Sequence, residues 1–438
     1  MLTTLKLLIK MVVPKFLFRL AQPIYHGLVA QIASIYFGAP STKLFVIGVT
    51  GTAGKSTTVM MLAKILNTDG KKTGYITTAG SSNGEDSRVN KHGLSMPGGW
   101  MLQKQLSEMV LKGCKFAIVE CTSEGLAQNR HKGIQFQGAL FTNLSPAHID
   151  SHGSFENYRN AKGKLFSSLT QTPESFIGVN LDDPNKNYFL SFLANKKFGV
   201  SMREDLTKPE SLETFIAENI SVSDKIDFDV ATNKETTHIS FQMFGTFNVA
   251  NALLAIGAAK IVGTNFATSA KAFNSLNSIP GRMETIQAKN GATVIVDYAP
   301  EPAAMESSLR AVQMLSHKKI IHVFGSTGGH RDVSKRFTFG EISAKFADTI
   351  IITNDDVYDS NPEEIAKNIE EGIGLQENAK VTTVHLILDR KEAIKKALEI
   401  AGSEDIVLIT GKGSEQFLIL PGNKRIHWDD RKVVKELL

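Results

Sequence analysis

Short apolar runs alternate with longer amphipathic stretches along most of the chain. Residues 44–50 form an apolar run rich in β-branched side chains, and a glycine-rich turn and a helical stretch at 55–70 follow it. Further runs at 116–121 and 138–144 have the length and the bounded ends of buried parallel strands. Strands that alternate with helices in this way predict a doubly wound α/β sheet.

A second series of strands and helices begins after Pro280 and Gly281, a pair that is typical of a hinge between two units. Before this pair, residues 247–263 predict a helix that ends at Gly263. After it, apolar runs predict strands at 292–299, 319–325, 348–355 and 405–411, separated by helical stretches such as 361–373 and 390–401.

A chain of 438 residues is too long for one ordinary core, so we expect more than one domain. The expected fold class is α/β, in three parts. A short helical segment at 1–43 precedes a central doubly wound domain at 44–280, which contains a phosphate-binding loop (P-loop). A Rossmann-like α/β domain follows at 281–438.

The first 42 residues contain four basic side chains and no Asp or Glu. The uncharged run at 20–42 is long enough to span a bilayer, but its polar residues and Pro23 disfavour a membrane span, and no cleavage site follows an apolar core. Two interpretations remain open. The segment is either a helix packed on the protein or on a partner subunit, or a basic amphipathic helix that makes a peripheral contact with an anionic membrane.

Composition narrows the class of protein. Apolar residues make up 42% of the chain and charged residues 21%, which is typical of a soluble globular protein. The net charge of +5 is mild, and no dense basic stripe with interleaved aromatic residues predicts nucleic-acid binding. Cys114 and Cys121 are too few for a disulfide framework or a four-cysteine zinc site, and they fit a reducing cytoplasm.

A phosphate-binding loop is the strongest chemical signal. Gly51, Gly54, Lys55 and Ser56 lie between a predicted strand and a predicted helix. Glycines allow backbone N–H groups to close around phosphate oxygens, Lys55 reaches the β- and γ-phosphates, and Ser56 supplies a hydroxyl for Mg²⁺. Only two residues separate the glycines, which is shorter than the general P-loop spacing.

The ordered motifs resemble those of the Mur ligase family, which builds the peptide of peptidoglycan precursors. The loop TGTAGKST at 50–57 is similar to the phosphate loop of that family. The resemblance continues through VECTSEGLAQNR (119–130), FTNLSPAHIDSHGSFENYRNAKGKLF (141–166), GTFNVANALLA (245–255) and GRMET (281–285), and then through VDYAPEP, VFGSTGGHRDVSKR, TNDD, LDRKEAI, GKGSEQF and WDDR. The order is that of the branch that adds the third residue of the peptide.

The resemblance implies an ATP-dependent ligase that joins a carboxylate to an amine through an acyl-phosphate. It implies two Mg²⁺ ions, held by Glu120, His148 and Ser56, with a carbamylated Lys162 beside them. ATP would be bound by the loop, by the helix that carries Asn248 and Asn251, and by residues of the C-terminal part. The nucleotide-binding residues are then Thr50, Gly51, Thr52, Ala53, Gly54, Lys55, Ser56, Thr57, Asn248, Asn251, Arg282, Asp297, Tyr298, Lys335 and Arg336.

The substrates are implied to be a muramoyl-peptide acceptor and a free amino acid. The residues that would contact them are Thr122, Ser123, Arg130, Asp355, Asp356, Tyr358, Gly411 and Glu415. Tyr358 stands where diaminopimelate-adding enzymes carry an arginine, and the neighbouring carboxylates favour a cationic side chain. We therefore expect a diamino acid, with lysine or ornithine preferred over diaminopimelate.

Several alternatives remain. Only some forty residues precede the loop, where the tripeptide synthetases have a UDP-binding domain, so the acceptor is left open between UDP-linked, lipid-linked and other forms. Folylpolyglutamate synthase has a similar length, although its loop reads Gly-Lys-Gly-Ser. A Mur-type amidating subunit would need a four-cysteine zinc ribbon. A non-catalytic nucleotide-binding scaffold for cell-wall enzymes belongs to a different class. The oligomeric state is left open.

Overall fold

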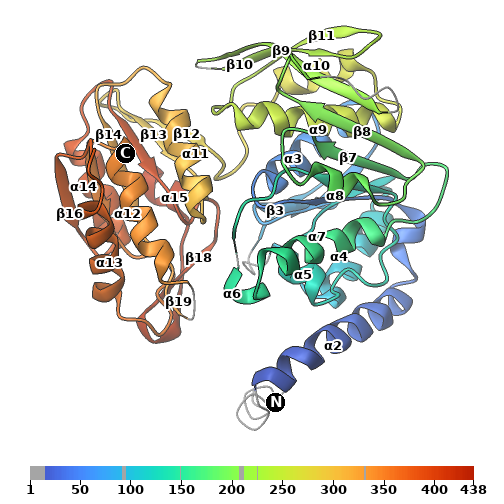
Figure 1. Ribbon diagram of the computed structural model, residues 1–438, viewed down its shortest axis with the longest axis horizontal. Helices are drawn as coiled ribbons and strands as arrows, with labels where there is room; N and C mark the ends of the chain where they lie inside the picture. Colours follow the sequence, from blue (N-terminus) through green and yellow to red (C-terminus); the bar gives the residue numbers. More distant parts are fainter. Residues whose placement is uncertain (1–14, 91–94, 148, 207–211, 224, 330–331) are drawn as a thin grey trace.

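The computed structural model describes residues 15–90, 95–147, 149–206, 212–223, 225–329 and 332–438. Two separate sheets dominate the described part, one built from residues 45–241 and the other from residues 284–409 (Figure 1). This arrangement confirms the α/β class and the two successive series of strands that the sequence predicts.

The central sheet has eleven strands within the described residues, in the order β11-β10-β9-β8-β7-β6-β1-β5-β2-β3-β4. The six neighbouring pairs from β9 through β8, β7, β6, β1 and β5 to β2 are parallel, and the outer pairs are antiparallel. The strand bounds are β1 Phe45–Thr50, β2 Thr73–Ile76, β3 Gly80–Ser82, β4 Ser87–Val89, β5 Phe116–Glu120, β6 Gly138–Phe141, β7 Phe176–Asn180, β8 Lys196–Ser201, β9 Glu213–Val222, β10 Ile226–Ala231 and β11 Thr236–Phe241.

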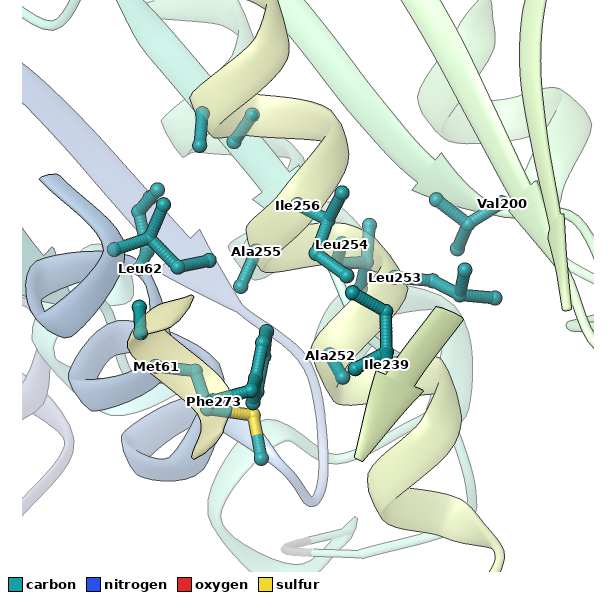
Figure 2. Close-up of a cluster of buried hydrophobic side chains, with 14 of the residues drawn as sticks. Met61, Leu62, Val200, Ile239, Ala252, Leu253, Leu254, Ala255, Ile256 and Phe273 are labelled. Carbon is teal, nitrogen blue, oxygen red and sulfur yellow. The ribbon is translucent and has the colours of Figure 1, made fainter. Parts of the chain in front are cut away.

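Helices cover both faces of this sheet. One face packs against α3 (Lys55–Thr68), α9 (Phe247–Ile261) and α10 (Phe266–Asn274). Figure 2 shows this core, with Leu62 of α3 on the Ala255 side of α9 and Leu253 of α9 on the side of Val200. The other face packs against α4 (Gly99–Leu111), α5 (Ser123–Ala127), α7 (Phe155–Ser167) and α8 (Lys186–Leu190). A short α6 (Ile149–His152) precedes α7.

The C-terminal sheet has the order β12-β13-β17-β14-β15-β16, and only the β12–β13 pair is antiparallel. Its strands are β12 Glu284–Gln287, β13 Thr293–Val296, β14 Ile320–Phe324, β15 Thr349–Ile352, β16 Thr383–Leu386 and β17 Ile406–Ile409. One face packs on α11 (Pro302–Gln313), α12 (Ser334–Phe346) and α13 (Pro362–Gly374), and the other on α14 (Arg390–Ile400) and α15 (Asp430–Leu437). A hairpin of β18 (Phe417–Leu420) and β19 (Lys424–His427), joined by η2 (Pro421–Asn423), lies beside it.

The N-terminal segment forms α2 (Lys15–Tyr36), which is followed by η1 (Pro40–Lys43). Helix α2 packs along α4 and extends beyond the edge of the central domain (Figure 1). A helix is confirmed here, and among the described residues no helix has both the length and the apolar character that crossing a bilayer requires.

The C-terminal core contains a buried histidine whose titration makes folding pH-dependent. His322 on β14 contacts Ser343 Oγ at 2.8 Å and Thr410 Oγ1 at 3.0 Å. Burial, with the nearby Arg390 guanidinium, lowers the pKa of His322 to about 3. In the unfolded chain a histidine titrates near pH 6.5. Between these values the unfolded state binds a proton that the folded state does not, so the free energy of unfolding falls as the pH drops from about 6.5 towards 3.

We expect this loss to approach 1.4 kcal/mol per pH unit within that window. The measurement is urea denaturation of the wild type and of His322→Gln at pH 7 and pH 4. The variant should lose less stability between the two pH values than the wild type does. His385→Gln, on β16 of the same sheet, serves as the control and should keep the wild-type pH dependence. An unchanged dependence in His322→Gln would contradict the assignment.

Candidate active site

The carboxyl ends of the parallel strands in both sheets face one cavity. The residues after β1, β2, β5 and β6 approach it from the central sheet, and those after β13, β14, β15 and β17 approach it from the C-terminal sheet. The cavity has a volume of about 820 Å³. Ligand sites in open α/β sheets form at this edge, because the loops that leave parallel strands meet there.

The phosphate loop forms a close-fitting cradle between β1 and α3. Gly51 (φ +152°) and Gly54 (φ +79°) adopt backbone conformations that side chains disfavour. A Cβ atom on Gly51 would lie 1.9 Å from Thr142 Oγ1, and one on Gly54 would lie 2.2 Å from Asn251 Oδ1. Glycine is therefore required at both positions, and the N-terminus of α3 is left open to bind an anion.

Gly54→Ala is expected to weaken nucleotide binding at least about tenfold, because the new Cβ displaces Asn251 and the loop. Titration calorimetry with ADP measures this directly. Gly70→Ala is the matched control, since Gly70 has a similar φ of +74° but no neighbouring atom within 4 Å of an added Cβ. The control should lose stability and keep its nucleotide affinity; equal affinity losses in both variants would contradict the role of the loop.

Glu120 lies at the end of β5, next to the loop. Its Oε2 accepts hydrogen bonds from Ser56 Oγ at 2.6 Å and from the Thr78 backbone N–H at 2.8 Å, and its Oε1 accepts one from Thr78 Oγ1 at 2.9 Å. Arg282 belongs to the C-terminal part of the chain, and its guanidinium donates a hydrogen bond to Ser56 Oγ at 3.1 Å. Carboxylate, hydroxyl and cation therefore meet at one point beside the phosphate cradle.

Lys55 and Lys162 are two lysines that contact the backbone of the loop, and Lys162 is buried while Lys55 is half-buried. Lys55 Nζ donates to Thr52 O at 2.7 Å, and Lys162 Nζ donates to Gly51 O at 2.7 Å and lies 4.3 Å from the centre of the Tyr158 ring. Burial lowers the pKa of Lys55. Burial and the positive charge of Lys55 lower the pKa of Lys162 well below its usual value. A larger share of Lys162 is therefore a neutral amine, the form that reacts with CO₂.

The donors at this end of the cavity fit Mg²⁺ with a nucleotide. Mg²⁺ is usually held by one or two carboxylates together with substrate phosphates and water, so it does not need a cage of protein ligands. Ser56 and Glu120 supply hydroxyl and carboxylate oxygens 2.6 Å apart beside the phosphate cradle. His148, which we expected as a further ligand, lies outside the described residues.

Helix α9 brings two buried amides to the cavity, as their spacing predicts. Asn251 Nδ2 donates to Asn248 Oδ1 at 3.0 Å, and Asn248 Nδ2 donates to Phe244 O at 2.7 Å. Asn251 Oδ1 faces the loop, 3.4 Å from Thr58 Oγ1. Phe247 also lines the cavity. Asn251 therefore supports the loop directly, and Asn248 fixes its orientation.

The C-terminal part contributes an aromatic and cationic wall. The Arg282 guanidinium stacks 4.5 Å from the centre of the Tyr298 ring. Asp297 accepts from the Met283 backbone N–H at 3.1 Å, which holds the loop that carries Arg282. Lys335 lines the cavity and pairs with Glu301 at 2.5 Å.

Two residues lie elsewhere than we expected. Thr50 does not line the cavity, because its Oγ1 donates to Cys121 O at 2.8 Å between the strands. Arg336 does not line it either: it is buried against α13, where it donates to Asn368 Oδ1 at 2.9 Å. Adjacent residues on α12 point about 100° apart, and here Lys335 faces the cavity while Arg336 faces α13.

The acceptor wall is named for the substrate that the sequence led us to expect there, and we define it as Ser95, Met96, Thr122, Ser123, Glu124 and Arg130. These residues line the cavity from the central domain. Thr122 caps α5 by accepting from the Gly125 backbone N–H at 3.2 Å. Arg130 donates to Met96 O at 2.7 Å and to Gln128 Oε1. The predicted Thr122, Ser123 and Arg130 therefore line the cavity together, from the central domain.

At the opposite end lies an acidic cluster with a lysine at its centre. Lys412 Nζ lies 2.5 Å from Glu415, 2.8 Å from Asp356 and 3.8 Å from Asp355. Burial alone would lower the pKa of Lys412, but these carboxylates raise it. The formal charges of the three carboxylates and the ammonium sum to −2, and burial raises the pKa of Asp356 and of Glu415. Gly411 and Tyr358 line the same end of the cavity.

Arg425 on β19 also lines this end, and its guanidinium lies 3.6 Å from the centre of the Phe417 ring. The β18–β19 hairpin meets the 357–358 loop through the Val357 N–H to Ile419 O bond at 2.9 Å. An arginine is thus present although position 358 is tyrosine. The expected preference for lysine or ornithine rested on the acidic cluster and on the lack of an arginine at position 358, and Arg425 weakens the second of these grounds.

The sequence alone did not single out several contributors. Thr78 follows β2 at the same sheet edge as Glu120, and Tyr158 lies one helical turn before Lys162, so position along the elements was an available signal for both. Asn143 Oδ1 accepts from the Ala53 backbone N–H at 2.9 Å, and this residue belongs to the FTNL motif. Arg425 carried no such signal, because the hairpin that positions it was not predicted.

Comparisons with known proteins identify the family of this chain. The profile described as "Mur ligase middle domain" matches residues 49–259, and "Mur ligase, glutamate ligase domain" matches residues 281–413. The chain is 35% identical over 411 residues to the UDP-N-acetylmuramoyl-L-alanyl-D-glutamate--2,6-diaminopimelate ligase of Geobacillus kaustophilus, covering 93% of this chain and 81% of that relative.

This chain belongs to the Mur ligase family. Like its relatives, this Mur ligase is an ATP-dependent, ADP-forming amide ligase of peptidoglycan precursor synthesis. A solved structure of a UDP-N-acetylmuramoyl-L-alanyl-D-glutamate--2,6-diaminopimelate ligase aligns with a TM-score of 0.59 at 28% identity, covering 90% of this chain and 78% of that one. A folylpolyglutamate synthase of Mycobacterium tuberculosis aligns with a TM-score of 0.68 at 15% identity (89% of this chain, 93% of that one), a likeness of fold alone.

Proposed function

We propose that this Mur ligase activates the acceptor carboxylate at Glu120, Lys55, Arg282 and Lys162, and that an amino acid held towards the 355–415 end of the cavity then attacks it. An oxygen of the carboxylate attacks the γ-phosphorus of ATP, and ADP leaves. The amine attacks the acyl carbon, the C–O bond to phosphate breaks, and the amine loses a proton. The observation that carries the proposal is the convergence of Ser56, Glu120 and Arg282 on one point.

Each group has a specific task. The backbone N–H groups of the loop and Lys55 bind the phosphates, and Arg282 offsets charge that develops on the transferring phosphoryl group. Mg²⁺, when bound, supplies Lewis-acid stabilisation of the phosphoryl oxygens. We assign the first of two ions to Ser56 and Glu120. A carbamate on Lys162 would turn a buried cation into an anion suited to the second ion.

We propose diaminopimelate as the amino acid added. This diamino acid carries two ammonium and two carboxylate groups, and the cavity end offers the acidic cluster together with Arg425. The curated relatives are named for the same amino acid. The remaining predicted contacts, Tyr358 and Gly411, would shape this subsite. The acceptor is a muramoyl peptide whose carrier we leave open at this stage.

We also propose that residues 1–43, 44–280 and 281–438 are the three structural units, with the last closing on the nucleotide through Arg282 and Lys335. The match of two separate profiles to 49–259 and 281–413 supports the division at residue 281. The ligase would act in the cytoplasm, where ATP is available.

Mass spectrometry of coupling reactions tests the amino-acid assignment. Diaminopimelate, lysine and ornithine are offered with ATP, Mg²⁺ and a muramoyl dipeptide in UDP-linked and lipid-linked form. Diaminopimelate should be preferred, and Arg425→Gln should reduce this preference more than Arg425→Lys, which keeps the charge. A preference for lysine that is unaffected by Arg425→Gln would contradict the assignment of the amino acid, and the ligase proposal would stand.

A further inference from the structure

Helix α2 buries its small residues and exposes its large apolar ones. Ala30 and Ala33 are completely buried, and Ser34 Oγ donates to Gly133 O at 3.0 Å. The contact with α4 is close, since a Cβ atom on Gly99 would lie 2.3 Å from Ala30 Cβ. An amphipathic helix normally packs its large apolar side chains inward, so this helix has a second face that the described part of the chain does not cover.

That second face is the α2 stripe, which we define as Ile24, Tyr25, Leu28, Ile32, Ile35 and Tyr36. Each of these side chains is more than half exposed. At 100° per residue the six positions fall within an arc of about 120°, so they form one continuous strip along the helix. Trp100 of α4 extends the strip, since its ring lies 5.1 Å from that of Tyr36 and is itself 43% exposed.

Charge decides what fits the α2 stripe. Residues 1–42 carry Lys6, Lys10, Lys15 and Arg19 and no acidic residue. A second copy of the chain would carry the same positive charges in this segment and no acidic residue there to pair with them. An anionic lipid surface offers both an apolar layer for the stripe and negative headgroups for the basic residues. Tyr25, Tyr36 and Trp100 are residue types enriched at the boundary between lipid and water.

We propose that α2 docks on an anionic bilayer, lying in the plane of the surface with the α2 stripe in the lipid. The depth of such a contact is about 5–10 Å, so the polar backbone of the helix stays satisfied internally and no membrane span is needed. This inference goes beyond the ligase reaction, because it assigns a surface that takes no part in the chemistry of the cavity.

Docking would also fix where the acceptor arrives. Gln22 and the carbonyl of Pro23 on α2 accept hydrogen bonds from Gln128 and Asn129, both at 3.3 Å. The next residue, Arg130, belongs to the acceptor wall. Helix α2 therefore packs against the segment that carries Arg130. With α2 lying on the lipid, the acceptor wall would be about one helix diameter, or ~10 Å, from the membrane surface. We therefore infer that the acceptor is a lipid-anchored muramoyl peptide, an inference that rests on the proposed function.

Vesicle flotation with the full chain tests the docking without requiring activity. The wild type should float with vesicles of phosphatidylcholine and phosphatidylglycerol, should float poorly with phosphatidylcholine alone, and should detach as salt increases. The double variant Ile32→Glu/Ile35→Glu should bind at least about tenfold more weakly. The matched control is Met314→Glu/Leu375→Glu, two exposed apolar residues of the C-terminal part that change the net charge equally.

The control should float like the wild type. Failure of the wild type to float, or equal binding by the stripe variant, would overturn the proposal. Light scattering tests whether a second copy of the chain covers the stripe instead. If the wild type is a dimer that does not float and the stripe variant is a monomer, the stripe is a dimer contact and the docking proposal is overturned. Thermal melting verifies that both variants fold.

The substrate class has its own readout. Coupling to a lipid-linked muramoyl dipeptide in anionic vesicles should fall in Ile32→Glu/Ile35→Glu. Coupling to a UDP-linked dipeptide in solution should proceed at the same rate in this variant as in the wild type. Equal losses with both acceptors would contradict the proposal and would make α2 a structural element. Absence of any coupling by a wild type that still floats would count against the proposed ligase function and leave the docking intact.

Discussion

Glu120→Gln is expected to lower kcat by about 10³-fold with little change in fold, because it removes the charge that would hold Mg²⁺. Glutamine can keep the local hydrogen bonds. Its oxygen can accept from Ser56 Oγ and from the Thr78 N–H, while its NH₂ group faces the Thr78 hydroxyl, which can accept as well as donate. The measurement is amino-acid-dependent phosphate release at saturating ATP, together with the thermal midpoint.

The effect should depend on Mg²⁺. Binding of ADP without Mg²⁺ should be nearly unchanged in Glu120→Gln, whereas the gain in affinity that Mg²⁺ gives the wild type should be lost. Glu85→Gln is the control, since this exposed carboxylate pairs with Lys72 and Lys112 and does not line the cavity. A Glu120→Gln enzyme within about tenfold of the wild-type kcat would show that the carboxylate is not needed for the phosphoryl step.

The second large effect is expected at Lys162. Lys162→Ala should reduce kcat by about 10²–10³-fold, because the anion that we propose for the carbamate is lost. Small carboxylates such as acetate should restore part of the rate by occupying the space that the side chain leaves. In the wild type, removal of CO₂ should lower activity, and the loss should be greater at lower pH, since only the neutral amine forms a carbamate.

Lys164→Ala is a matched control for this prediction. Lys164 lies on the same helix, is half-buried and donates to Ala127 O at 3.2 Å, but it does not line the cavity. Its replacement should change kcat little, and acetate should not affect it. Two results together would contradict the carbamate: acetate does not rescue Lys162→Ala, and the wild-type activity does not depend on CO₂. Lys162 would then be a buried cation whose role is to hold Gly51 O.

The fold could be predicted where local pattern and tertiary packing agree. The runs at 44–50, 116–121 and 292–299 became β1, β5 and β13 because each is apolar enough to be buried on both faces of a parallel sheet. The hairpin β18–β19 and the antiparallel strands β9 to β11 were not predicted. Strands β18 and β19 have only four residues each, and β9 is buried along only part of its length, so the apolar pattern gives a weak signal there.

The same limits decided which residues of the candidate site could be predicted from the sequence. Glycine spacing identified the phosphate loop, and a strand end identified Glu120, because both depend on local geometry. The paired environment of Lys412 could not be inferred, since it requires knowledge that residues 355, 356 and 415 converge. Arg336 shows the opposite error: its motif suggested a role beside Lys335, but the rotation of about 100° between adjacent helical residues places it against α13.

The central claim is that ATP converts the acceptor carboxylate into an acyl-phosphate within this cavity. The most direct test labels both oxygens of that carboxylate with a heavy isotope and analyses the released phosphate by mass spectrometry after complete coupling. If the account is right, each phosphate carries one labelled oxygen and the amide product keeps the other. Phosphate that is released without label, while labelled oxygen stays with the peptide or passes to water, would contradict it.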